Sequence, residues 1–384
     1  MEQLTRQPGP GAAARRARLS VTTGLVARDD EFCHRDASPI EQAGAASTDP
    51  RFFERYWNVW HDDTGDLLLA VGGSCYPVLG RVESYAIVNY RGDHRSVRSF
   101  RPVSDELSDL TVGPIRPTIR AGLRRWQHHL DPGEWDFSYD LTWVDTRRPT
   151  YGAAWGPEPT EGAGERQVTA GFESFGQVYG WIRIGDTRVE WTPGLAGGTR
   201  DRHWGVGRGV GGPALNGGRT HRPGWKGGMW IDLHDVGLWG KKLLYDIDDP
   251  RPGHGTVAQV HRRLRFEPDT QQFIEGLIDL VFDDGQVRTL HLERLGSQTA
   301  YMRCGFYGGT PDKSLHHGQY DGPAHTEWDR FDVTDPGIRT QLTGLNEHHC
   351  KVTDGDHVTT GILQPVEPDA YEACLAGKPG WSLW

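Results

Sequence analysis

The sequence has no long run of Lys or Arg and no apolar stretch long enough to span a membrane. Its formal net charge is −10, and a negative field repels phosphate, which argues against a nucleic-acid-binding protein. The basic start, "MEQLTRQPGPGAAARRARLS", lacks the apolar segment of a signal peptide. We therefore expect a disordered tail over residues 1–30, no transmembrane segment and no nucleic-acid partner.

Cysteine is scarce as well. The five cysteines are scattered and form no CxxC pair. This argues against a disulfide framework and favours the reducing cytoplasm. The motifs GxSxG, GxxxxGK[ST], HExxH and HxH are absent, and paired histidines such as His128-His129 point to opposite sides of an extended chain. We predict no metal site and no cofactor. A metal-dependent enzyme that uses the His-rich C-terminal half is the weakest of three hypotheses.

Tryptophan and glycine, in contrast, are abundant, with 15 and 51 residues. Trp supplies large, rigid surface for a core or for the wall of a site that binds a bulky ligand. Gly at this frequency, without low-complexity repeats, is typical of the many tight turns of an all-β protein.

Strand patterns fill most of the chain. Between residues 135 and 143 large apolar residues alternate with polar ones, which predicts a half-buried strand. Hairpins are predicted around Gly185-Asp186 and Asp284-Gly285. Helical spacing favours a helix at 117–130 and a short helix at 367–376.

These patterns predict an all-β fold with antiparallel sandwiches or barrels and few short helices. At 384 residues the chain exceeds the usual size of one domain, so two are expected. Gly and Pro are densest between residues 193 and 224, which is typical of a linker or a functional loop. We therefore place the domain boundary near residue 195, between domains at 31–195 and 196–384.

The segment "GGTRDRHWGVGRGVGG", residues 197–212, places three ionisable side chains and a Trp between glycine clusters. Asp201 can accept hydrogen bonds from Arg202 or His203, and a histidine, with an ordinary pKa of about 6.5, suits acid–base catalysis. Trp204 offers an apolar wall or a cation–π face. From residue types alone we favour the alternative, in which Asp201 and Arg202 form a structural ion pair and Trp204 lies in the core.

Two other segments contain candidate ligand-binding residues. In "FFERYWNVWHDDTGD" the tryptophans are candidates, although core packing is the simpler interpretation. In "GWKGGMWIDLHD" alternate residues share one face of a predicted strand, which suits a barrel lumen or, equally, a solvent-facing strand. The candidates from these two segments are Trp57, Trp60, Trp225, Trp230, Asp232 and His234.

Residues 171–208 contain an aromatic and Gly-rich strand, a hairpin and a Gly-rich turn that lead into Asp201-Arg202-His203-Trp204-Gly205. This order resembles the central segment of the lipocalin-like hydratase/cyclase superfamily, which includes carotenoid 1,2-hydratases, tocopherol cyclase and lipocalin-like Diels–Alderases. The resemblance implies an N-terminal β-sandwich-like domain, a C-terminal lipocalin-like barrel and a ligand pocket in or between them. Bacterial relatives usually carry Ser at the position of His203, so the resemblance implies no role for this residue.

The resemblance also implies an enzyme that hydrates, cyclises or isomerises an apolar small molecule, such as an isoprenoid, polyketide or steroid-like compound, without a redox cofactor. On this hypothesis Asp201 and His203 transfer protons, and Arg202 orients Asp201 or the substrate. Trp57, Trp204 and Trp230 then stabilise developing positive charge. The alternative is a non-catalytic, lipocalin-like carrier of a lipophilic ligand, because both functions need the same cavity. The oligomeric state stays open.

Overall fold

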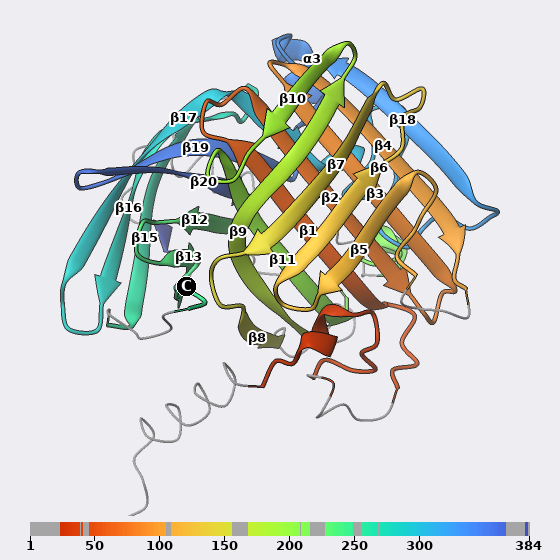
Figure 1. Cartoon of the computed structure of the whole chain (residues 1–384), viewed down its shortest axis with the longest axis horizontal. Helices are drawn as coiled ribbons and strands as arrows, with labels where there is room; N and C mark the ends of the chain where they lie inside the picture. Colours follow the sequence, from red (N-terminus) through yellow and green to blue (C-terminus); the bar gives the residue numbers. More distant parts are fainter. Residues whose placement is uncertain are drawn as a thin grey trace, which may run out of the picture.

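The structure is a computed structural model that describes residues 24–38, 40, 46–104, 109–155, 168–207, 209–215, 227–248, 255–267, 269–365 and 381–382. These residues form two antiparallel sheets and a few short helices, which confirms the predicted all-β fold class (Figure 1). The helices are η1 (Ala27–Asp30), α2 (Gly212–Leu215), η3 (Met302–Cys304) and α3 (Pro336–Leu342). None of the helices that the structure describes is long and apolar enough to cross a membrane.

The first sheet has 12 strands and curls until β5 contacts β3. Its order is β18 (His325–Asp332), β4 (Asp93–Pro102), β3 (Arg81–Tyr90), β2 (Leu67–Tyr76), β1 (Phe52–Asp62), β11 (Ala196–Val206), β9 (Val168–Ile184), β7 (Phe137–Asp145), β6 (Arg125–Leu130) and β5 (Ile115–Ala121). In addition, β8 (Thr150–Trp155) and β10 (Thr187–Trp191) pair with β9.

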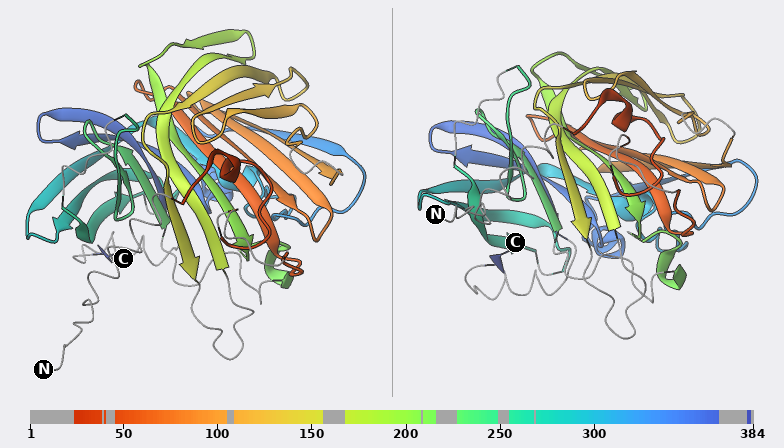
Figure 2. Two further views of the ribbon diagram at one scale, coloured as in Figure 1. Left: turned by 60° about the horizontal axis from the view of Figure 1, so that its bottom comes forward. Right: turned by 90° about the horizontal axis from the view of Figure 1, so that it is seen from below.

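The second sheet has nine strands. Its order is β14 (Lys242–Leu244), β13 (Gly237–Trp239), β12 (Gly227–Asp232), β20 (His357–Pro365), β19 (Asn346–Asp354), β17 (Val287–Tyr301), β16 (Phe273–Phe282), β15 (Val257–Phe266) and β21 (Trp381–Ser382). Figure 2 shows this sheet, coloured from teal to blue, beside the green strands β9 and β11 of the first sheet.

Three large apolar clusters follow from this arrangement. The curled first sheet encloses one cluster, which includes Trp60, Trp126 and Trp143. A second cluster joins the other face of the first sheet to the second sheet, with Trp57 and Trp230 among its members. The third belongs to the second sheet. Because successive side chains of a strand point to opposite faces, β1 contributes Trp57 and Trp60 to different clusters.

The predicted strand and hairpins are confirmed. In β7, Tyr139, Leu141 and Trp143 are fully buried, and the residues between them are half-buried. β9 turns into β10 at Gly185-Asp186, and β16 turns into β17 around Asp284-Gly285.

The predicted helix at 117–130 is wrong, because this segment forms the antiparallel pair β5 and β6. In β6 the side chains of Trp126, His128 and Leu130 are buried on one face, with period two, although the apolar spacing also fits a helix. The turn places Leu123 at a φ of 60°, and its backbone N–H donates to the Asp30 carboxylate at 2.6 Å. Strand pairing and this tertiary contact override the local spacing. The other predicted helix, 367–376, lies outside the described residues.

The sequence predicts that residues 24–30 belong to a disordered tail, but they are part of the fold. They contain η1, at the lower end of the first sheet in Figure 1, and Asp29 and Asp30 are fully buried there. The sheets also mix the two predicted domains, because β11 and β18 both belong to the first sheet. The division of the chain near residue 195 stays a prediction.

Candidate functional site

Strand β11 carries the predicted catalytic segment and is buried almost throughout, between β1 and β9. Its side chains alternate between two environments. Arg200 lies on the enclosed side of the first sheet, with its guanidinium carbon 5.6 Å from the centre of the Trp126 ring. Asp201 and His203 lie on the side that faces the second sheet, next to Glu173 of β9.

The imidazole of His203 lies between two buried carboxylates. Its Nδ1 is 2.9 Å from Asp201 Oδ2, and its Nε2 is 3.5 Å from Glu173 Oε1. The exposed fraction is 7% for Asp201, 9% for His203 and 1% for Glu173, so water screens these groups poorly. Gly171, paired with His203, makes room for the ring, since a Cβ at Gly171 would lie 2.4 Å from His203 Cδ2. This arrangement can hold and transfer a proton.

Two tryptophans border this group. Trp230 of β12 donates its indole N–H to Glu173 Oε2 at 2.9 Å and packs against Trp57 of β1, with ring centroids 4.8 Å apart. Trp57 is the direct neighbour of Asp201 in the β1–β11 pair. The tryptophans therefore fix one carboxylate and give the group an apolar wall.

A third carboxyl group comes from the second sheet. Glu347 of β19 is fully buried and accepts a hydrogen bond from Gln364 of β20, while its Oε2 has no hydrogen-bond partner. Burial raises the pKa of Glu347 well above its ordinary value, and the charge of Asp201 raises it further, against the effect of Gln364. Burial and the charge of Asp201 therefore favour the neutral, protonated form of the Glu347 carboxyl group.

A cleft of about 190 Å³ borders the same group where the two sheets meet. Phe175 and Thr199 line it, two residues along their strands from Glu173 and Asp201, and Trp230 forms a wall shared with the buried group. Asp232 lines the cleft as well, although its side chain also pairs with Arg147 at 2.9 Å. The cleft has room for a small part of an apolar ligand.

The predicted residues Arg202 and Trp204 lie on the opposite face of β11, together with Arg200, and this face contacts the N-terminal segment. Arg200 pairs with Asp30 and Asp145 at 2.8 Å each, and Arg202 pairs with Glu54. These ion pairs are buried, so Arg200 and Arg202 have a structural role.

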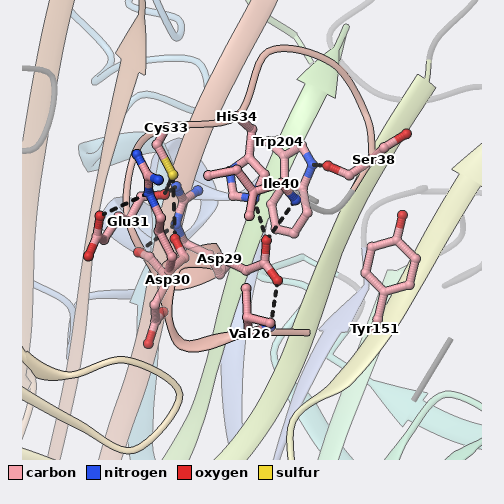
Figure 3. A network of polar contacts seen from close by, with 12 residues as sticks. Val26, Asp29, Asp30, Glu31, Cys33, His34, Ser38, Ile40, Tyr151 and Trp204 are labelled. Atoms are coloured by element: carbon pink, nitrogen blue, oxygen red, sulfur yellow. Dashed lines mark hydrogen bonds and ion pairs between the residues drawn. The ribbon is translucent and has the colours of Figure 1, made fainter. Parts of the chain in front are cut away.

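Figure 3 shows the continuation of this network. Asp29 accepts hydrogen bonds from the backbone of Val26 and Ile40 and faces the ring of His34. That ring stacks on Trp204, with centroids 3.6 Å apart, and the Trp204 indole donates to the Ser38 carbonyl at 3.0 Å. Trp204 is therefore core, as the alternative interpretation of the sequence held, and it does not meet Asp201.

Three further predicted residues are not brought to the site. Trp60 points into the enclosed cluster, stacked on Trp143 at 6.2 Å. β12 ends at Asp232, so His234 lies in the following turn and is exposed instead of sharing a strand face with Trp230. Trp225 lies outside the described residues.

Two groups of described side chains have ligating atoms within 4.8 Å of one another, the distance needed to share a metal ion. One is Glu173, Asp201 and His203, and the other is His234 with two aspartates at the surface. In the buried group each ring nitrogen of His203 faces a different carboxylate, which suits a shared proton, and metal binding would take one nitrogen out of this bridge. Arg288 pairs with both aspartates of the surface group and competes with a cation there.

Residues 25–237, more than half of the chain, match a family described as "Family of unknown function (DUF8625)". The chain belongs to this family. No curated protein matches the DUF8625 chain. Among solved structures, kievitone hydratase from Nectria haematococca is similar, with a TM-score of 0.38 and 11% identity over 88% of this chain and 97% of that chain. The residues that match DUF8625 include Glu173, Asp201 and His203 but end before Glu347.

Glu173 and Glu347 were not among the residues predicted from the sequence. Glu173 lies within the stretch used for the resemblance, and the strand pattern predicts its face but not its partner. Glu347 begins "EHHC" in the His-rich C-terminal half, which the sequence suggests only as a source of metal ligands. Alternation along that segment separates Glu347 and His349 from His348, and this signal was present in the sequence.

Proposed function

We propose that this chain is a cofactor-independent enzyme that hydrates, cyclises or isomerises an apolar small molecule by proton transfer. Membership of the hydratase/cyclase superfamily is part of this proposal. The observation that supports it is the imidazole of His203, held between the carboxylates of Asp201 and Glu173 and buried between the two sheets. Such groups, desolvated and mutually oriented, are suited to acid–base catalysis.

The three side chains have different parts in this mechanism. Asp201 and His203 form the pair that accepts a proton, since Asp201 Oδ1 has no hydrogen-bond partner in the structure. Glu173, fixed by the indole of Trp230, orients the other side of the imidazole ring. Glu347, whose protonated form is favoured by burial, is the donor.

The reactions in this class move protons and electron pairs without oxidation. In a hydration, water loses a proton to the Asp201–His203 pair while its oxygen bonds to one carbon of a double bond. Glu347 gives a proton to the other carbon. The accepted proton then returns from the Asp201–His203 pair to Glu347. One water is consumed, and both groups regain their starting state.

Deuterium incorporation tests this proposal even while the substrate is unidentified. The protein is incubated in D₂O with an apolar extract of its source cells, and released compounds are analysed by mass spectrometry. We expect a compound that gains deuterium at carbon, with or without the mass of water, in a reaction that Asp201→Asn and His203→Gln reduce at least a hundredfold. The exposed His357→Gln variant is the matched control and keeps full activity. Recovery of bound compounds without label would refute catalysis and indicate the carrier.

A further inference from the structure

Arg55 of β1 is a buried cation beside this site that none of the proposed steps uses. Its exposed fraction is 3%, and its Nε donates to Ser74 Oγ at 3.2 Å. The guanidinium carbon lies 4.8 Å from the centre of the Phe53 ring and 5.9 Å from that of Tyr307. Its Nη2 has no hydrogen-bond partner. A buried guanidinium N–H without an acceptor is costly, which makes Nη2 a candidate donor to a ligand.

The nearby Glu83 keeps Arg55 charged without satisfying Nη2. Burial opposes the charge of Arg55, but Tyr307, Tyr76 and Glu83 together raise its pKa above the ordinary value. The Glu83 carboxylate is already occupied by the Tyr76 hydroxyl, by His317 Nδ1 at 2.6 Å and by the Gly318 backbone N–H at 3.0 Å. Arg55 therefore remains charged, and its Nη2 group lacks an acceptor.

Tyr85 of β3 brings a second donor to the same place. Gly72 of β2 is paired with both Trp57 and Tyr85, and a Cβ at Gly72 would lie 2.5 Å from the Tyr85 hydroxyl. The absence of a side chain at Gly72 thus lets the phenol extend over β2 toward Trp57. Burial raises the pKa of Tyr85 well above its ordinary value, so the hydroxyl keeps its proton. The Tyr85 ring lies 6.3 Å from the Tyr307 ring, whose centre is 5.9 Å from the Arg55 guanidinium carbon, so both donors flank Tyr307.

We propose that Arg55 and Tyr85 bind a substrate oxygen on which negative charge develops, so that the substrate is an apolar compound whose reacting carbons are conjugated to a carbonyl group. This inference rests on the proposed function and names its substrate class. It replaces the expectation of a positively charged intermediate beside the tryptophans, because a buried guanidinium stabilises an enolate and opposes a carbocation.

The step balances without an oxidant. Water loses its proton to the Asp201–His203 pair as its oxygen bonds to the carbon β to the carbonyl. The electron pair of the double bond shifts toward the carbonyl oxygen, and the enolate forms beside Arg55 and Tyr85. Glu347 protonates the α carbon, and the pair returns its proton to Glu347. The product differs from the substrate by one water.

The test uses 4-nitrophenol, whose phenol and phenolate forms absorb at different wavelengths, as a probe of charge stabilisation. We expect the wild-type chain to bind phenolate preferentially, which lowers the pKa of the bound probe. Arg55→Met, of similar length but uncharged, should prefer phenolate over phenol at least tenfold less than wild type does. Tyr85→Phe should reduce this preference by a smaller factor. Circular dichroism tests whether Arg55→Met is folded. If it is not, Tyr85→Phe decides the test alone.

His203→Gln separates this inference from the proposed function. It should abolish deuterium incorporation and retain the phenolate preference, because His203 is not one of the groups that hold the oxygen. If the wild-type chain does not bind the probe at millimolar concentration, or if Arg55→Met and Tyr85→Phe bind phenolate as well as wild type, the inference is wrong. Phenolate preference without deuterium incorporation in any compound would leave the oxygen site standing and refute the enzymatic proposal.

Discussion

Neighbouring residues of β11 should separate activity from stability, because they point to opposite faces of one strand. Arg202 is fully buried and donates hydrogen bonds to the Glu31 carbonyl at 2.8 Å and the Arg55 carbonyl at 3.0 Å, in addition to its ion pair with Glu54. Arg202→Met leaves these acceptors unpaired, and breaking one side of a buried ion pair costs about 3–5 kcal/mol of unfolding free energy. Asp201, in contrast, contacts His203, and Asn preserves its size. We expect Asp201→Asn to cost about 1 kcal/mol or less.

Equilibrium unfolding in urea measures both variants, and deuterium incorporation measures their activity. Asp201→Asn should unfold near the wild-type midpoint and lose deuterium incorporation. Arg202→Met should unfold at a much lower urea concentration and keep deuterium incorporation while it is folded. If Asp201→Asn is destabilised as strongly as Arg202→Met, Asp201 is a structural ion-pair partner and not part of a proton-transfer site. If Arg202→Met is as stable as wild type, the ion pair and hydrogen bonds of Arg202 do not stabilise the fold.

Three further outcomes are expected. Glu347→Gln keeps the size of the side chain but no acidic proton, so deuterium incorporation should fall at least a hundredfold while the melting temperature stays equal or rises; unchanged activity would exclude Glu347 as the donor. Burial raises the pKa of Glu83 from 4.5 to about 7, so its contribution to stability is complete below pH 4.5 and is lost as pH rises toward 7. Unfolding of Glu83→Gln across this range should show a flatter pH dependence than wild type, and equal curves would contradict the assignment. Treatment with EDTA followed by dialysis should leave activity intact; loss of activity that Zn²⁺ restores would make Glu173, Asp201 and His203 a metal site.

Local sequence patterns account for much of the fold. Alternation predicts β7, and Gly-containing pairs predict two hairpins, because both depend on neighbouring residues alone. The helix predicted at 117–130 fails for a physical reason: its apolar residues fit period two and a helical spacing, and the pairing of β6 with β7 selects the strand. The buried contact of Asp30 with the turn at Leu123 adds a tertiary constraint that no local window contains.

The sequence by itself also singled out Asp201 and His203, and strict alternation already implies that Arg202 and Trp204 face away from them. Only the tertiary structure decided what meets Asp201 and His203. Arg55 and Glu173 lie beside them because β1, β11 and β9 pair side by side. Strand β19, which carries Glu347, contacts β1 through the rings of His349 and His61, 4.2 Å apart. The register of such pairing depends on burial over whole sheets, so no short stretch of sequence contains it.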